Sequence, residues 1–330
     1  MNDRRVSLLE NYDIEVLRTW KGRGAVLCDT TQGIMILKEY MGPRDKIIFQ
    51  DALLTHIREQ GFSNVEQIIR DKEGELLVQD QDGVCFFLKT YFDGQECNVR
   101  DIAECKQAVQ TLASLHKASD VKANENLLAG KAAFQIEKEL EKHNKELRKV
   151  RKFLKEKGQK TDFEIYLMKS FDYFFETALQ VTEELQQHLT NAVVPGAKII
   201  CHGDYQYHNI LFSGGQINVI NFEKCIFDNP VRDLYLFMRK LLEKSDWSLE
   251  VGESLLLSYM KERKMDEQDH IQLYYRLFYP EKFWKIVNFY YNSGKAWIPG
   301  RNMEKLEKLM DQERDKQVFL EKYRLNYGLF

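Results

Sequence analysis

The sequence lacks the features of a secreted, membrane-spanning or zinc-binding protein. Its six cysteines form no C-x-x-C pair and have no ligand spacing with the seven histidines, so the common zinc motifs are excluded. No run approaches the ~20 apolar residues of a membrane span, and the N-terminus leads into no apolar signal core. We therefore expect reduced, mostly buried thiols and a cytoplasmic protein, made and kept inside a cell.

A strong charge of either sign is also absent. The 48 basic and 51 acidic residues give a net charge of −3, which provides no overall attraction to nucleic acid or to an anionic membrane. The stretch 145–160 is rich in lysine, but Glu146 and Glu156 dilute it and no array of base-stacking aromatic residues accompanies it. We expect neither nucleic acid nor a membrane as a partner.

What the sequence does contain is a change of hydrophobic period near residue 100. Before that point, short apolar runs alternate with turn signals, and one helical pattern follows Pro43 and ends before Gly61. This part predicts a small sheet of about five strands with one inserted helix. The apolar runs are 25–28, 34–38, 65–69, 75–79 and 84–88.

After residue 100 the apolar residues recur at helical spacing, and the first predicted helix ends near His116. The segment 131–160 keeps one apolar seam, which indicates an amphipathic helix docked on the larger part of the protein, with a coiled-coil arm as the alternative. One β element interrupts the helices. It consists of a strand at 197–201, a loop at 202–209 and a hairpin with strands at 209–212 and 216–220. The expected fold class is α+β.

The loop at 202–209 has the pattern H-x-D-x-x-x-x-N. In phosphotransferases with this pattern, the aspartate is the base and the asparagine is an amide ligand of Mg²⁺. The order of strand, loop and hairpin predicts that Asp204, Asn209 and Asn221 lie within a few ångströms of one another. The alternative is an Asp and an Asn that shape an ordinary turn.

Lys38 ends the first hairpin, where a lysine reaches the α- and β-phosphates of a nucleotide in kinases. The alternative is a solvated lysine at a strand end. A glutamate on the helix after Pro43 should pair with it, but none stands near the middle of that helix: Asp51 is shorter, and Glu59 lies close to the end. We therefore expect an altered partner for Lys38.

These motifs together resemble the aminoglycoside phosphotransferase and choline kinase superfamily, and the resemblance runs nearly end to end. Within it, the C-terminal pattern is most similar to the CotS-type spore coat proteins of endospore-forming bacteria. The superfamily motifs are Leu37-Lys38, 88–94, 112–116, 202–209 and 230–234, and the C-terminal pattern comprises 283–292, Trp297 and a helix at 303–325.

The resemblance implies a bilobal, protein-kinase-like fold, with an antiparallel-sheet N-terminal lobe at 1–92 that covers a nucleotide and a mostly helical C-terminal lobe at 93–330. It implies ATP and Mg²⁺ as cofactors, a small-molecule acceptor, and a place in the spore coat beside other coat proteins. The implied roles are Lys38, Leu88, Thr90 and Phe92 as nucleotide contacts, Asp204 as base, and Asn209 as metal ligand.

Position 221 departs from the family pattern. The family has an aspartate there, at the end of the metal strand 216–223, whereas this chain has Asn221, whose amide carries no charge. Glu223 lies two residues further on an extended segment, so its side chain faces the same side. Glu223 is therefore the alternative metal ligand, or else a surface glutamate.

Two functions compete on these observations. One is an ATP- and Mg²⁺-dependent phosphotransferase acting on a small hydroxyl compound, and the other is a catalytically impaired protein that binds ligands or builds the spore coat. The aromatic residues between 274 and 297 recur at helical spacing and are interpreted as core, so they assign no acceptor.

Overall fold

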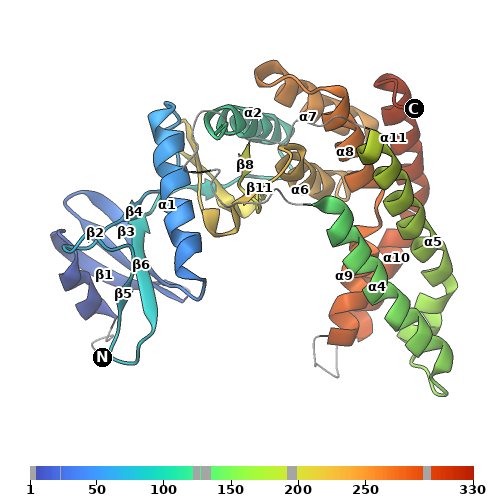
Figure 1. Cartoon of the computed structure of the whole chain (residues 1–330), viewed down its shortest axis with the longest axis horizontal. Helices are drawn as coiled ribbons and strands as arrows, with labels where there is room; N and C mark the ends of the chain where they lie inside the picture. The colour runs from blue at the N-terminus through green and yellow to red at the C-terminus, as the bar shows by residue number, and fades with distance from the viewer. Residues whose placement is uncertain (1–4, 23, 122–126, 128–134, 192–198, 293–298) are drawn as a thin grey trace. The chain divides into compact units, whose positions relative to one another are not determined.

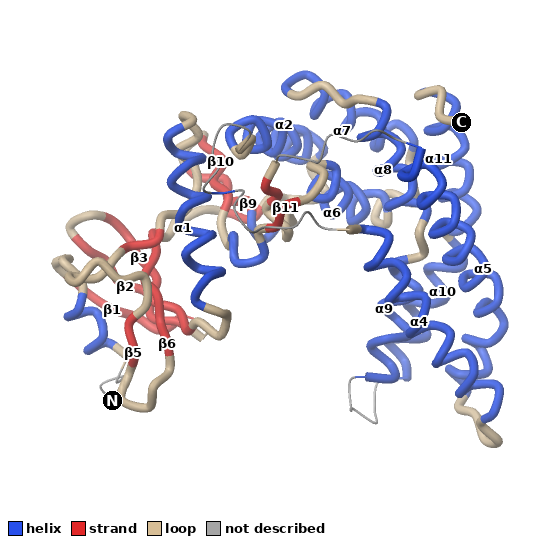
Figure 2. Tube along the Cα trace, in the orientation of Figure 1, coloured by secondary structure: helices blue, strands red, loops and turns tan. Residues whose placement is uncertain are grey.

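The computed structural model of the chain describes residues 5–22, 24–121, 127, 135–191, 199–292 and 299–330 (Figure 1). It forms two compact units that interleave along the chain, the first from residues 1–131, 198–227 and 258–263, the second from 132–197, 228–257 and 264–330. All strands of the described residues belong to the first unit (Figure 2). The lobes expected at 1–92 and 93–330 stay a prediction, and Trp297 lies outside the described residues.

The first unit is built on an antiparallel sheet of six strands. The strand order is β1-β2-β3-β6-β4, and β5 also pairs with β6. β3 and β6 align so that Lys38 is opposite Phe87 and Leu37 is opposite Leu88. The strands are β1 (Val16–Gly22), β2 (Ala25–Thr30), β3 (Gly33–Glu39), β4 (Ile68–Ile69), β5 (Val78–Gln79) and β6 (Cys85–Thr90).

The two faces of this sheet have different surroundings, because successive side chains along a strand point to opposite faces. One face carries Leu37 and Leu88 into an apolar core that also contains Leu8 and Leu9 of the 3-10 helix η1 (Val6–Asn11). The alternation directs Lys38, Phe87 and Lys89 to the other face, where the candidate site lies.

A single helix, α1 (Arg44–Glu59), is inserted between β3 and β4. It begins directly after Pro43, whose fixed φ suits a helix start, and ends before Gly61, which takes φ +88° as a left-handed C-terminal residue. Its buried side chains include Ile47, Leu53 and Ile57, at the spacing of one helix face. The predicted hairpin and inserted helix are thus confirmed.

The first unit also contains two smaller sheets and a second α-helix. β9 (Ile210–Ser213) pairs with both β10 (Gln216–Val219) and β7 (Gln95–Glu96), and β8 (Ile200–Cys201) pairs with β11 (Ile226–Phe227). The helix α2 (Ile102–Ala118) begins at Asp101, whose carboxylate accepts a hydrogen bond from Ala103 N at 2.8 Å.

The described part of the second unit is helical with connecting loops. α4 (Ile136–Glu156) buries an apolar seam that includes Leu140 and Leu147, and it lies against α5 (Asp162–Asn191) and α9 (Glu281–Asn292). Between α4 and α5, Asn144 Nδ2 donates a hydrogen bond to Thr182 Oγ1 at 2.8 Å. The further helices are α6 (Val231–Leu242), α8 (Glu267–Phe278), α10 (Pro299–Asp311), α11 (Glu313–Asn326) and the first part of α7 (Leu249–Glu262), whose residues 258–262 belong to the first unit.

The structure corrects the sequence-based elements in four places. The metal strand expected at 216–223 ends at Val219, and Glu223 lies in the 3-10 helix η3 (Phe222–Lys224) and not on an extended segment. The main sheet has six strands instead of about five, because the polar segment Val16–Gly22 also forms a strand. The runs 65–69 and 75–79 contribute only two strand residues each. The single helix expected at 303–325 is two helices that meet at Gln312, whose side chain donates to the carbonyl of Glu243 at 2.9 Å.

Candidate functional site

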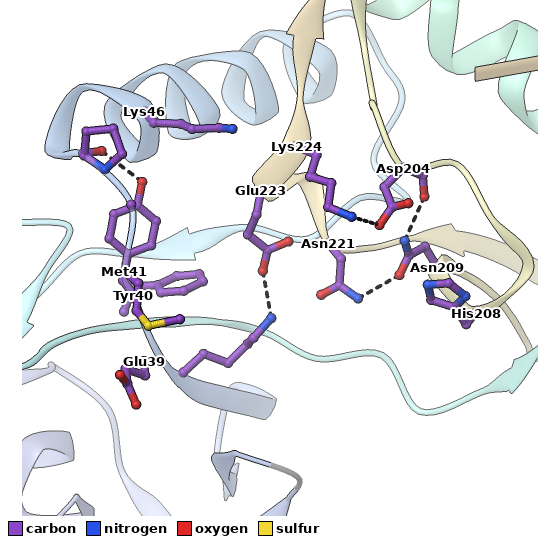
Figure 3. Close-up of a pocket in the computed structure, with 14 residues that line it drawn as sticks. Glu39, Tyr40, Met41, Lys46, Asp204, His208, Asn209, Asn221, Glu223 and Lys224 are labelled. Carbon is purple, nitrogen blue, oxygen red and sulfur yellow. Dashed lines mark hydrogen bonds and ion pairs between the residues drawn. The ribbon is translucent and has the colours of Figure 1, made fainter. Parts of the chain in front are cut away.

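The loop between β8 and the 3-10 helix η2 (Tyr207–Asn209) carries Asp204, and Asn221 follows β10 closely. Asn209 Nδ2 donates to the main-chain carbonyl of Asp204 at 2.8 Å, and Asn221 Nδ2 donates to Asn209 Oδ1 at 2.9 Å (Figure 3). The structure therefore brings together the three residues that the sequence predicted to be neighbours.

Two aromatic side chains hold this loop in place. His202 Nδ1 accepts a hydrogen bond from Asp204 N at 3.1 Å, and its Nε2 lies 2.9 Å from the carbonyl oxygen of Ile220, so a ring protonated on Nε2 satisfies both contacts. Tyr205 is fully buried and donates through its hydroxyl to the carbonyl of Ala108 in α2 at 2.7 Å. The loop is thus tied to the strand before Asn221 and to a helix.

Two backbone positions of the site are left-handed. Gly203 has φ +80°, and a Cβ atom at this position would lie 2.0 Å from the carbonyl oxygen of Lys224, so only glycine fits. Asn221 has φ +67° and ψ +59°, a conformation that asparagine and aspartate tolerate better than other side-chain-bearing residues.

The Asp204 carboxylate accepts hydrogen bonds on both oxygens. Gln206 Nε2 donates to Oδ1 at 2.6 Å, and Lys224 Nζ donates to Oδ2 at 2.9 Å. Partial burial raises the pKa of Asp204, but the charge and hydrogen bond of Lys224 lower the pKa more, and the net shift is downward. The group is therefore a carboxylate at neutral pH and is equipped to accept a proton or a hydrogen bond.

Lys38 has the altered partner that the sequence led us to expect. Its ammonium pairs with Glu223 Oε1 at 2.8 Å, and Asp51 of α1 pairs instead with Arg70. Burial raises the pKa of Glu223, but Lys89 and Lys38 together outweigh it and lower the pKa to about 2. Glu223 is therefore an ionised, partly buried member of the site and not a simple surface glutamate.

Lys89 and Glu66 form a buried ion pair beside these residues. The Lys89 ammonium donates to Glu66 Oε2 at 2.7 Å, to Asn221 Oδ1 at 2.9 Å and to Glu223 Oε1 at 3.3 Å. Glu66 also accepts from the backbone N–H groups of Asn221, at 2.7 Å, and Phe222, at 3.1 Å. Burial lowers the pKa of Lys89, but the two carboxylates raise the pKa overall, so the lysine is charged.

The sequence reasoning missed Lys89 and Glu66, although a signal was present. Glu66 stands inside the apolar run 65–69, and Lys89 follows directly after the apolar run 84–88. Charged side chains are almost never fully buried unless they are paired, so two opposite charges in buried strand-like runs indicate one buried ion pair.

A cavity of about 540 Å³, within the usual range for a small-ligand site, is lined by Lys38, Asp204 and Glu223 among others (Figure 3). The predicted nucleotide contacts Leu88, Thr90 and Phe92 are not among its lining residues, so these three roles stay a prediction. Leu88 lies in the apolar core, and Thr90 Oγ1 accepts from Gln67 N at 2.9 Å. The lining residues are Lys38, Glu39, Tyr40, Met41, Gly42, Pro43, Lys46, Phe87, Asp204, His208, Asn209, Asn221, Glu223 and Lys224.

The residues present do not fit the Mg²⁺ that the resemblance implies. Asn209 Oδ1 accepts from Asn221, Asn221 Oδ1 accepts from Lys89, and Glu223 Oε1 accepts from Lys38 and Lys89. Divalent cations in phosphate sites are bound by carboxylates whose charge they balance. Here lysines already balance the carboxylates of Glu66, Glu223 and Asp204.

Solved structures of similar architecture define the fold of the chain. The chain matches a crystal structure of an aminoglycoside phosphotransferase from Alicyclobacillus acidocaldarius with a TM-score of 0.83 at 18% identity, covering 98% of this chain and 96% of the other. It matches spectinomycin phosphotransferase APH(9)-Ia, in complex with ADP and spectinomycin, with a TM-score of 0.66 at 15% identity, covering 93% of each chain. The fold is therefore the bilobal α+β fold of the aminoglycoside phosphotransferases.

A third match at similar coverage is amicoumacin kinase hAmiN, in complex with AMP-PNP and Ca²⁺, with a TM-score of 0.59 at 13% identity over 96% of this chain and 94% of the other. No curated protein matches the chain in sequence. The model of the family described as "Spore coat putative kinase YutH" matches residues 5–323, and the chain belongs to this family. The resemblance to CotS-type spore coat proteins is thereby confirmed.

Proposed function

We propose that this chain binds a nucleoside triphosphate in the cavity of the first unit and transfers its terminal phosphoryl group to a hydroxyl group of a small molecule. The observation that carries the proposal is the Asp204 carboxylate, which lines the cavity on a loop held by His202 and Tyr205. Structural neighbours were solved with ADP or AMP-PNP, which supports a nucleotide as the ligand.

In the proposed reaction, Asp204 accepts the proton of the attacking hydroxyl group as the new oxygen–phosphorus bond forms. The bond between the terminal phosphorus and its bridging oxygen breaks, and the nucleoside diphosphate leaves with the electron pair. Lys38, Lys46 and Lys224 line the same cavity and bring positive charge to the phosphates. Lys224 is mostly exposed, so its side chain is able to exchange Asp204 for a phosphate oxygen.

A second function is favoured by the amide pair at the place of the family's metal site. Asn221 is hydrogen-bonded to Asn209 and to Lys89, and neither amide brings a negative charge. A protein with this arrangement binds nucleotide without turning it over and acts as a ligand-binding or structural component of the coat. We retain it as the competing proposal.

Two measurements separate these functions. A thermal-shift titration with ATP reports binding, because a ligand at 100 times its Kd stabilises a fold by about 2.7 kcal/mol. Release of ADP in the presence of a panel of hydroxyl compounds reports transfer. If the chain is a phosphotransferase, Asp204→Asn lowers turnover by roughly 10²–10⁴-fold while ATP still shifts the melting temperature.

The matched control is Asp172→Asn, because Asp172 also pairs with a cation, Arg151 at 2.6 Å, but stands on α5 and is not among the cavity-lining residues. Binding of ATP without acceptor-dependent ADP release would favour the competing proposal. Absence of any ATP-induced shift would overturn the phosphotransferase proposal and would leave a purely structural role in the coat.

The family assignment also supports a place in the spore coat. None of the helices in the described residues is both long and apolar enough to cross a membrane. We propose that the chain is carried in the coat by contacts with other coat proteins. Detection of the chain in coat extracts of purified spores tests this, and its recovery only from the mother-cell cytoplasm would contradict it.

A further inference from the structure

Lys89 stands at an unusual position for a lysine. It belongs to β6, and side-chain alternation places it beside Phe87, whose ring centroid lies 5.8 Å from the ammonium, on the face of the sheet toward the cavity. Only 3% of its side chain is exposed, and the side chain of its partner Glu66 is fully buried. A pair buried to this degree is part of the fold and is not a surface group that a ligand pushes aside.

The Lys89 ammonium reaches the oxygens that a cation at this site would use. It donates to Asn221 Oδ1 at 2.9 Å and to Glu223 Oε1 at 3.3 Å. Asn221 in turn donates its amide hydrogen to Asn209 Oδ1. A single ammonium thus contacts two of the three candidate metal ligands directly and the third through Asn221.

The charges around it leave nothing for a divalent ion to balance. Lys38 and Lys89 offset Glu66 and Glu223, and Lys224 offsets Asp204. A divalent cation bound to Asn221 and Glu223 would stand next to the Lys89 ammonium, whose side chain is only 3% exposed. Such like charges repel strongly because little water screens them.

We propose that the Lys89 ammonium is a built-in cation that takes the place of the divalent metal, so that this chain excludes metal from the site and binds a nucleotide without it. The inference rests on the proposed function only for its nucleotide part. The exclusion of metal is a property of the chain alone and is tested without nucleotide.

The first experiment measures Mn²⁺ binding to the nucleotide-free protein by electron paramagnetic resonance. The unmodified chain should bind no Mn²⁺ at the site, and Asn221→Asp alone should not create binding because Lys89 remains to pair with the new carboxylate. The triple variant Asn221→Asp, Lys89→Met, Glu66→Gln should gain one Mn²⁺ site. The Glu66 change keeps the fold from carrying an unpaired buried charge.

The matched control adds Lys152→Met and Glu156→Gln to Asn221→Asp. These two residues form an exposed ion pair on α4 with the same charge types, so the control makes the same chemical changes at residues that are not part of the site. Gain of the Mn²⁺ site in the first triple variant but not in the control supports the inference. Stoichiometric Mn²⁺ binding by the unmodified chain overturns it, as does a correctly folded triple variant, judged by circular dichroism, that gains none.

The second experiment measures ATP binding by calorimetry in EDTA and in excess Mg²⁺. The expected Kd values agree within about threefold, and a tenfold or greater gain with Mg²⁺ overturns the inference. If ATP does not bind under either condition, the proposed function fails, and the Mn²⁺ experiment alone decides whether Lys89 excludes metal.

Discussion

Lys89 and Glu66 are almost completely withdrawn from water, and each is satisfied by several partners. Burying the two charges costs the free energy of their hydration. Their mutual attraction and the hydrogen bonds to Asn221 and Phe222 offset this cost. The pair also determines where the backbone after β10 turns, because the Glu66 carboxylate receives two consecutive N–H groups from it. Removing one partner therefore affects both the charge balance and the turn.

A double-mutant cycle on this pair should show strong coupling. We expect Lys89→Met alone to destabilise the fold by about 3–5 kcal/mol, because it leaves the Glu66 carboxylate buried without a counter-charge. Lys89→Met with Glu66→Gln should cost less than the sum of the single changes, by more than about 1 kcal/mol. Urea unfolding gives the free energy of unfolding of the unmodified chain, the two single variants and the double variant. Additive costs would show that Lys89 and Glu66 are not energetically coupled.

The dependence of the free energy of unfolding on pH in the acid range should reveal the ionisation of Glu223. Its pKa is lowered from 4.5 to about 2 in the folded protein. A carboxylate with a depressed folded pKa adds stability that is present above its unfolded value and is lost as the pH falls toward the folded value. A shift of this size corresponds to about 3 kcal/mol at most.

We therefore expect the stability advantage of the unmodified chain over Glu223→Gln to be full above about pH 4.5 and to shrink as the pH falls toward 2. Urea titrations at several pH values in this range measure it. Glu156→Gln is the control, because Glu156 pairs with Lys152 in an exposed position. A pH-independent difference between the unmodified chain and Glu223→Gln would mean that Glu223 is not ionised by its two lysines.

Among the elements, the contact between α7 and α11 depends on the absence of a side chain. A Cβ atom on Gly252 would lie 2.4 Å from Cε2 of Phe319, a fully buried aromatic residue of α11. Two effects of a Gly252→Ala change are opposed. Alanine favours the helix by about 1 kcal/mol, whereas overpacking of a filled core costs about 1–3 kcal/mol.

We expect overpacking to win, so that Gly252→Ala lowers the free energy of unfolding. Gly300→Ala in α10 is the matched control, since its added Cβ meets no atom within 4 Å and should leave stability unchanged or raise it by a few tenths of a kcal/mol. Thermal and urea unfolding of the two variants measure the difference. Equal effects of the two changes would mean that α7 is able to move away from Phe319.

At the scale of the whole molecule, the chain is stabilised without covalent cross-links. All six cysteines are free thiols, and five of them are buried, with Cys85 partly accessible. The sequence predicted reduced and mostly buried thiols, and this is confirmed. Burial suppresses thiol reactivity because reagents react with an accessible thiolate.

Thiol labelling should therefore separate the folded and the unfolded molecule. We expect at most one fast-reacting thiol, Cys85, in the native protein and six in denaturant. Ellman's reagent measures both numbers, and Cys85→Ser should remove the fast native phase. Several fast thiols in the native protein would show that the cores of the units open more readily than their packing indicates.

The elements were largely predictable because they follow local patterns. The hairpin that ends at Lys38, the helix after Pro43 and the loop with Asp204 depend on turn residues and on hydrophobic period within a short window. The break at Gln312 was not predictable, because that residue is neither glycine nor proline and its side chain finds its partner at Glu243, 69 positions away. Strand lengths also differed, since pairing partners and not composition decide where a ladder ends.

The amino-acid sequence by itself determined the family, the fold class and the proximity of Asp204, Asn209 and Asn221, because these depend on motif letters and short spacings. Only the tertiary structure decided what those residues touch. Lys89 meets Asn221 across 132 positions, and Glu66 meets it across 155. No local hydrophobic period encodes such contacts, since they arise when separate strands and loops are brought together in one unit. These contacts determine whether the site accepts a metal ion or already contains its own cation.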